Sequence, residues 1–277
     1  MPDSKLFGKD IKRLEDPILL RGEAHFVDDI CLPEMTHACF VRSPFAHALV
    51  KGINASAAQE MEGVVAVLTL ADLRPQLVSE LLVVGLPSPS YRQESDRPVL
   101  ASEEVCYVGE PVAVVIAKSR HIAEDAAAIV DVDYEPLPAI SDCKKSLEDG
   151  SSTVRAGAPH NLMAEFLQEY GDVEAAFANA PHVFKESLLI HRGGSHSIEC
   201  RGCVARYEDI TDELTLWTSH QMPHSLMRTF VEITGLDENK VRIVTPHVGG
   251  GFGPKLVVYQ EDVSLLLASK ILKLPIK

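Results

Sequence analysis

The chain has 277 residues, of which 46% are hydrophobic and 24% charged, which suits folded domains and excludes collagen-like or low-complexity chains. It holds 26 Lys and Arg residues against 40 Asp and Glu residues, and the resulting net charge of −14 disfavours binding to nucleic acid. No apolar run approaches the roughly 20 residues of a membrane span, and the N-terminus lacks a signal-peptide pattern. We therefore expect a cytoplasmic protein without a membrane span, whose six cysteines are reduced.

The first half of the chain reads as a mixed α/β unit. Short β-rich runs predict strands within 36–54, 63–70, 105–117 and 130–134. Apolar residues at helical spacing predict a helix within 118–130. The segment 142–163 has no apolar periodicity, so we place a domain boundary between residues 145 and 146. The alternative is a long surface loop inside one domain.

The second half is predicted to contain three helices and several strands. The strands are expected near 183–190, 203–208, 213–218 and 241–246. The first helix is expected over Val173 to Ala180, and the second, over 223–234, ends at a glycine suited to a left-handed C-terminal cap, Gly235. The last helix follows residue 256. Its apolar residues share one face: Tyr259, Val263, Leu266, Leu267 and Ile271.

A glycine-rich loop, Gly249–Gly253, lies between the last predicted strand and the last helix. Clustered glycines allow backbone N–H groups to approach a ligand closely, and the following helix start favours an anion. The loop is neither a phosphate loop nor a dinucleotide fingerprint, because Pro254 and Leu256 occupy positions that those motifs need. A tightly packed turn without a ligand is the alternative.

Two other groups of residues carry weaker signals. The spacing of Cys200, Cys203, His220 and His224 is close to that of a small zinc module, but the strands predicted between them favour buried thiols and unrelated histidines. We therefore expect no metal site formed by this chain alone. Glu199 is interpreted as a structural or surface carboxylate.

Several strings, in this order, resemble the molybdenum-binding large subunit of the xanthine dehydrogenase and aldehyde oxidase family, especially carbon monoxide dehydrogenase-like members. They lie at 8–30, 40–50, 63–73, 97–117, 130–140, 197–205, 214–224 and 248–255. The resemblance implies an α/β (α+β) fold. A hammerhead-type α/β domain would occupy residues 1–145, and the truncated N-terminal part of the molybdopterin-binding domain would occupy 146–277.

The resemblance also implies site residues. Gln221 would sit beside an oxo ligand of molybdenum, and Gly250, Gly251, Phe252 and Gly253 would bring backbone and an aromatic ring against the metal centre. The catalytic glutamate of the family is expected beyond Lys277, so no catalytic residue is assigned here.

Two positions depart from the family pattern. Pro254 replaces a usual glycine and removes a backbone donor. Leu256 stands where xanthine-type members carry a substrate-contacting glutamate, which disfavours a purine substrate.

The implied function is that of part of a molybdenum hydroxylase, which oxidises or hydroxylates an aldehyde, heterocycle or CO-like substrate with water-derived oxygen. The implied cofactor is molybdenum–molybdopterin in its cytosine dinucleotide form, bound only in the complete complex. The implied partners are the missing C-terminal part of the subunit, an iron–sulfur subunit and an FAD subunit. The alternative is a non-catalytic fragment or assembly module that retains the hammerhead scaffold and exposes one apolar face of its 256–272 helix.

Overall fold

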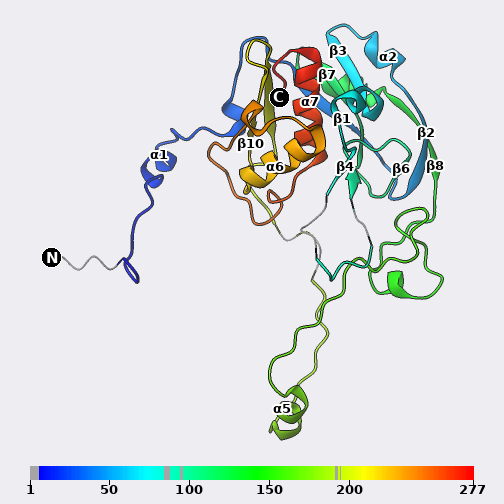
Figure 1. The fold of residues 1–277 in the computed structure, drawn as a ribbon, viewed down its shortest axis with the longest axis vertical. Coiled ribbons are helices and arrows are strands. Elements are labelled where there is room, and N and C mark those ends of the chain that lie inside the picture. The colour runs from blue at the N-terminus through cyan, green and yellow to red at the C-terminus, as the bar shows by residue number, and fades with distance from the viewer. Residues whose placement is uncertain (1–5, 84–87, 94–95, 191–192, 194) are drawn as a thin grey trace, which may run out of the picture.

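The computed structural model describes residues 6–83, 88–93, 96–190, 193 and 195–277 (Figure 1). Its helices are α1 (Asp16–Leu20), α2 (Ser56–Gln59), α3 (Leu70–Leu73), α4 (Arg120–Ala128), α5 (Val173–Asn179), α6 (Pro223–Thr234) and α7 (Gln260–Leu272). Its strands are β1 (His37–Arg42), β2 (Ala48–Asn54), β3 (Val64–Thr69), β4 (Leu81–Leu82), β5 (Arg97–Pro98), β6 (Glu104–Val105), β7 (Pro111–Ala117), β8 (Asp131–Pro136), β9 (Cys203–Glu208), β10 (Glu213–Thr218) and β11 (Val241–Val244). This mixed helix and strand content confirms the predicted α/β class.

The first unit is built around strand β7, which is buried along its whole length. It lies in the middle of an antiparallel sheet of order β1-β7-β3, while a second antiparallel sheet has the order β6-β2-β8. Successive side chains of a strand point to opposite faces. Ala113 and Val115 therefore join one hydrophobic cluster with β2 and α4, whereas Val114 and Ile116 join another on the far face. The continuous apolar run of β7 reflects this two-sided burial.

The second unit is a three-stranded sheet of order β11-β10-β9. Strands β9 and β10 are antiparallel, and β10 and β11 are parallel. Helix α6 connects the two parallel strands and packs against β4 and β11. As predicted, it ends at Gly235, whose φ of 68° is left-handed and whose N–H donates to the carbonyl oxygen of Val231 at 2.8 Å.

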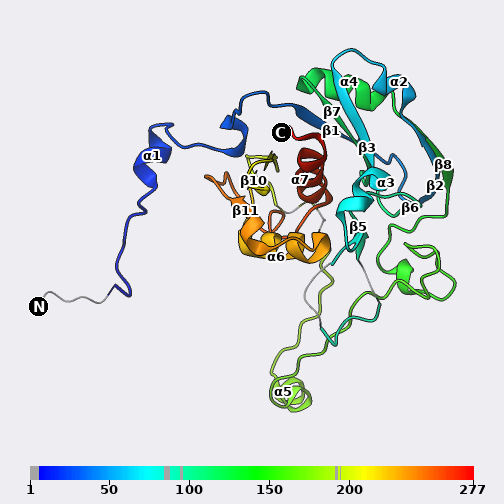
Figure 2. The same cartoon turned by 45° about the horizontal axis from the view of Figure 1, so that its top comes forward.

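Helix α7 joins the two units, and this corrects one prediction. The sequence indicated a helix with one apolar face, yet all side chains from Gln260 to Ser269 except that of Glu261 are buried. The helix lies between the β9–β11 sheet and the β1-β7-β3 sheet (Figure 2). Leu266 shares one hydrophobic cluster with Leu216 and Ile116. The apolar face expected to be exposed is therefore covered within this chain, because both units pack on the helix.

The segment between β8 and β9 projects from this body and carries α5 at its tip (Figure 1). Helix α5 has the predicted bounds to within one residue, but none of its residues is buried. The strand predicted over 183–190 is wrong, because these residues are irregular and exposed. They pair with no strand of the described chain, so their apolar pattern has no sheet to join. The boundary placed after residue 145 stays a prediction.

Candidate functional site

Three chain segments meet at one end of the β9–β11 sheet. The parallel strands β10 and β11 end together, with Trp217 opposite Val244, and Thr218 at the end of β10 pairs with Cys203 at the start of antiparallel β9. Gln221 follows β10, Gly249–Gly253 follows β11, and Glu199 precedes β9. Loops at the carboxyl ends of neighbouring parallel strands are where ligands bind in open α/β sheets.

Gln221 is in direct contact with the glycine loop. The N–H of Gly253 donates to Oε1 of Gln221 at 3.1 Å, and the N–H of Gln221 donates to the carbonyl oxygen of Lys255 at 2.7 Å. A Cβ atom placed on Gly251 would lie 2.5 Å from Cδ of Gln221. Only glycine at position 251 therefore allows the Gln221 amide to lie against the loop.

The backbone of the loop is left-handed at three residues. Gly250 and Gly253 have φ values of 100° and 103°, which glycine adopts without a steric penalty. Phe252 has a φ of 53°, a conformation that costs a residue with a side chain about 1–3 kcal/mol. Phe252 is 71% exposed. A strained backbone that presents an exposed aromatic ring is typical of a ligand site.

The carboxylate of Glu199 ties these segments together, a structural role whose partners the sequence interpretation did not assign. Its Oε2 accepts hydrogen bonds from the Ser219 hydroxyl at 2.5 Å, the Gly249 N–H at 2.7 Å and the Lys255 ammonium at 2.8 Å. The side chains of Lys255 and Glu199 are only 1% and 16% exposed. Burial by itself raises the pKa of Glu199, but the bonds from Lys255, Ser219 and Gly249 outweigh it and hold the pKa below its ordinary value.

A second charged cluster supports the loop from the side of helix α7. The carboxylate of Glu261 accepts hydrogen bonds from Arg42 at 2.7 Å and from Arg201 at 3.4 Å. The guanidinium of Arg201 lies 3.6 Å from the ring centroid of Tyr259, whose hydroxyl donates to the carbonyl oxygen of Pro254. These contacts link Arg42, in the first unit, to the backbone just after the glycine loop.

The four residues of the zinc alternative do not form a metal-binding group in the described part of the chain. Nδ1 of His220 accepts from the Met222 N–H at 2.9 Å and its Nε2 donates to the Val257 carbonyl oxygen at 3.1 Å, so both ring nitrogens are used. Burial raises the pKa of the Cys203 thiol, which opposes the thiolate that a metal requires. His224 is exposed. Over the described ranges, no three His, Cys, Asp or Glu side chains are grouped to hold a metal ion.

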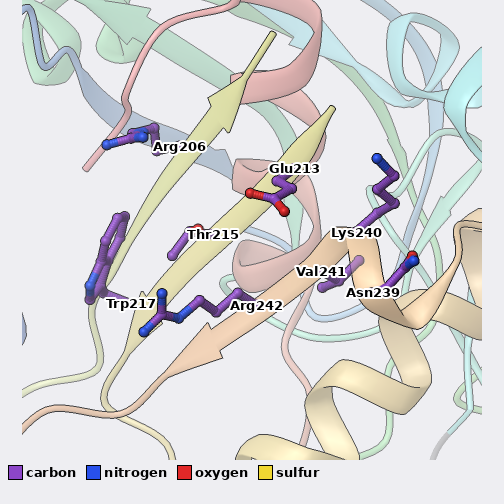
Figure 3. A pocket seen from close by; sticks show the side chains of 8 residues that line it. All are labelled: Arg206, Glu213, Thr215, Trp217, Asn239, Lys240, Val241 and Arg242. Atoms are coloured by element: carbon purple, nitrogen blue, oxygen red, sulfur yellow. The ribbon is translucent and has the colours of Figure 1, made fainter. Parts of the chain in front are cut away.

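A pocket of about 330 Å³ opens on a different face of the same sheet (Figure 3). Leu214 and Leu216 of β10 point to the core, so Thr215 and Trp217 point to the opposite face. The residues lining this pocket are Arg206, Glu213, Thr215, Trp217, Asn239, Lys240, Val241 and Arg242. None belongs to the predicted site, so the glycine loop and Gln221 form a separate feature.

Comparisons with known proteins agree with this architecture. Residues 21–138 match the family model "Aldehyde oxidase and xanthine dehydrogenase, a/b hammerhead domain", and residues 154–277 match "Molybdopterin cofactor-binding domain". This chain belongs to the aldehyde oxidase and xanthine dehydrogenase family. It is similar to the N-terminal portion of the family's molybdenum-binding large subunits. In the described part of the chain, no helix is long and apolar enough to span a membrane.

The relatives of this family member include named enzymes. The nicotine 6-hydroxylase large subunit of Paenarthrobacter nicotinovorans is 41% identical over 98% of this chain and 33% of its own. The carbon monoxide dehydrogenase large chain of Afipia carboxidovorans is 38% identical over 96% of this chain and 34% of its own. The crystal structure of quinoline 2-oxidoreductase from Pseudomonas putida 86 superposes with a TM-score of 0.87 and 33% identity, covering 97% of this chain and 34% of that chain. This chain therefore spans about a third of the length of these relatives.

The family implies a molybdopterin cofactor, and the site geometry fits one. A Cβ on Gly250 would lie 2.9 Å from the Phe252 ring, so glycine there lets the ring pack back on the loop, whereas a Cβ on Gly253 would meet nothing within 4 Å, so the loop is open to a ligand at that residue. Within the described chain, Nε2 of Gln221 donates to no acceptor. A pterin offers acceptors, which match this open donor.

Proposed function

We propose that this chain forms the cofactor-binding N-terminal part of the large subunit of a molybdenum hydroxylase, which oxidises an aldehyde, a heterocycle or a CO-like substrate with oxygen from water. The observation that carries the proposal is the contact between Gln221 and the Gly249–Gly253 loop at the carboxyl ends of β10 and β11. The family membership and the named relatives support it.

The residues of this chain would bind and orient the cofactor. Gln221 is held by the Gly253 N–H through Oε1, so its Nε2 is the group directed at an acceptor of the cofactor. The loop Gly250–Gly253 would bring backbone amides to the same group, and the exposed ring of Phe252 would shield it from water. When bound, the molybdenum–molybdopterin cofactor supplies the two-electron oxidation. We propose its cytosine dinucleotide form.

The proton-accepting base would come from the remainder of the subunit. Glu199 is a poor candidate, because its Oε2 already accepts three hydrogen bonds and its pKa lies below the ordinary value. Leu256 offers no polar group to a purine, so the aldehyde, heterocycle and CO classes are preferred. Iron–sulfur and FAD subunits would take the electrons away, and the complex would work in the cytoplasm.

The test is reconstitution with the rest of a family large subunit and its partner subunits. We expect molybdenum in elemental analysis and reduction of a dye acceptor by one of the proposed substrate classes. Gln221→Ala should retain molybdenum and lower turnover about 10²–10³-fold, because one preorganised donor is lost. His224→Ala, on an exposed side chain, is the control and should change little. A stable complex without molybdenum would refute the proposal.

The second candidate is a non-catalytic assembly module, favoured by the exposed apolar segment around α5. The apolar side chains of this segment include Phe166, Leu167, Tyr170, Phe184 and Leu189, each at least 76% exposed. Large exposed apolar surfaces mark association sites. An assembly module would bind the partner subunits through this segment without retaining molybdenum. We further propose that residues 1–145 and 146–277 act as the two units of the chain.

A further inference from the structure

We propose that Glu199 and Lys255 form a positioning clasp, which holds the Gly249–Gly253 loop against Gln221 before any cofactor binds. The proposal rests on the proposed function for its purpose, since the clasp orders the groups that would receive the cofactor. The clasp itself concerns only the position of the loop against Gln221, which can be measured without a cofactor. Neither residue is placed in contact with substrate, so both are positioning residues.

The first argument is connectivity. A single oxygen, Oε2 of Glu199, accepts bonds from the first residue of the loop, Gly249, and from Lys255, two residues beyond its last. The third donor, Ser219, lies two residues before Gln221. One carboxylate therefore fixes both ends of the loop and the segment that carries the amide.

The second argument is the close packing of the loop against Glu199. The Glu199 N–H donates to the Gly249 carbonyl oxygen at 3.2 Å, which adds a backbone bond to the side-chain bond. A Cβ on Gly249 would lie 2.5 Å from Cβ of Glu199. The loop thus lies directly on Glu199, and only glycine at position 249 permits this approach.

The third argument is electrostatic. A lysine that is 1% exposed must be paired, because an isolated buried ammonium is strongly unfavourable. Buried ion pairs add little stability compared with apolar residues of the same size, so a stability role alone does not account for Lys255. The pair does fix one geometry, since the charges and the Gly249 and Ser219 donors are satisfied together only when the loop is closed on Glu199.

The test measures amide hydrogen exchange of the 277-residue chain by NMR, without cofactor. Glu199→Gln and Lys255→Met should speed exchange at Gly249 and Gly253 about tenfold or more, while the amides of α7 keep their wild-type rates. The proton shift of the Gly253 amide should also move. This shift reports the bond between Gly253 and Gln221, which the substituted side chains do not make.

The matched control is Glu124→Gln, which makes the same chemical change in the exposed Arg120–Glu124 pair of α4. This control should leave the exchange rates of the Gly249 and Gly253 amides unchanged. If Glu199→Gln does not fold, Ser219→Ala removes one donor without leaving an unpaired charge and should speed exchange at Gly249 about threefold. Unchanged loop exchange, or an equal rise in α7, would overturn the clasp.

The two proposals fail in different ways. Exchange in the isolated chain involves no molybdenum, so an unchanged loop refutes the clasp and leaves the proposed function standing. Faster loop exchange in the variants, combined with a reconstituted wild-type complex that lacks molybdenum, supports the clasp and refutes the proposed function.

Discussion

The contact between Gly251 and Gln221 permits a substitution that separates the site from the stability of the fold. A methyl group at position 251 would lie 2.5 Å from Cδ and 2.7 Å from Oε1 of Gln221. Ordinary contacts are at least about 3.4 Å, so the Gln221 amide must swing away by about 1 Å in Gly251→Ala. The Gln221 side chain is exposed, so it can move into solvent once its bond to Gly253 is broken. Gly251 does not have a left-handed φ, so alanine causes no backbone strain.

The magnitude follows from two opposing terms. Loss of the bond between Gly253 and Gln221 costs about 1 kcal/mol, and replacing a glycine at a compatible φ stabilises by about 0.4–1 kcal/mol. The free energy of unfolding should therefore change by less than about 1 kcal/mol. Turnover of the reconstituted enzyme should fall about 10²-fold, because the displaced amide no longer reaches the cofactor.

The assay compares the denaturant midpoint, molybdenum content and turnover of Gly251→Ala with those of Gly52→Ala. Gly52 lies in β2, and a Cβ there meets no atom within 4 Å, so the control adds the same methyl group without displacing a side chain. If Gly251→Ala kept wild-type turnover although its Gln221 side chain was displaced, the reasoning would be refuted. Gly251→Val adds a β-branched side chain and should also abolish molybdenum binding.

Three further predictions concern the metal alternative, the shared core and pH. A chelator should leave the melting temperature unchanged, and metal-dependent melting that Cys203→Ser abolishes would contradict this. Leu266→Ala should cost about 2–5 kcal/mol and keep one unfolding transition, because Leu266 is buried between both units; two separate transitions would disprove this reading. Burial raises the pKa of Glu261, but Arg201 and Arg42 outweigh it, so the pKa lies below the ordinary 4.5. The contribution of ionised Glu261 to the stability of the fold is therefore complete above its ordinary pKa and is lost as the pH falls through the lower pKa of the folded state. Glu261→Gln should flatten this decline of the denaturant midpoint with falling pH. An unaltered pH dependence would argue against the pairing.

Local patterns in the sequence were sufficient for most elements and for the position of the loop. The apolar run of β7, the periodicity of α6 and the glycine at position 235 are short-range signals, because the propensity and the cap lie within a few residues. The glycine loop was placed after a strand and before a helix by the same reasoning. Its family resemblance assigned Gln221 to the same site, and the structure brings the two into contact.

The two-sided burial of α7 and the role of Glu199 were decided only by tertiary structure. Periodicity identifies the most apolar face of a helix, but a second covering layer comes from β7, which is far away in the sequence. Glu199 and Lys255 are separated by 56 residues and come together because antiparallel β9 begins at the end of the sheet where parallel β10 and β11 finish. A lone carboxylate and a lone lysine carry no signal in the sequence. The structural role of these two residues depends on burial and on three donors that converge on one carboxylate oxygen, and only the folded chain creates both.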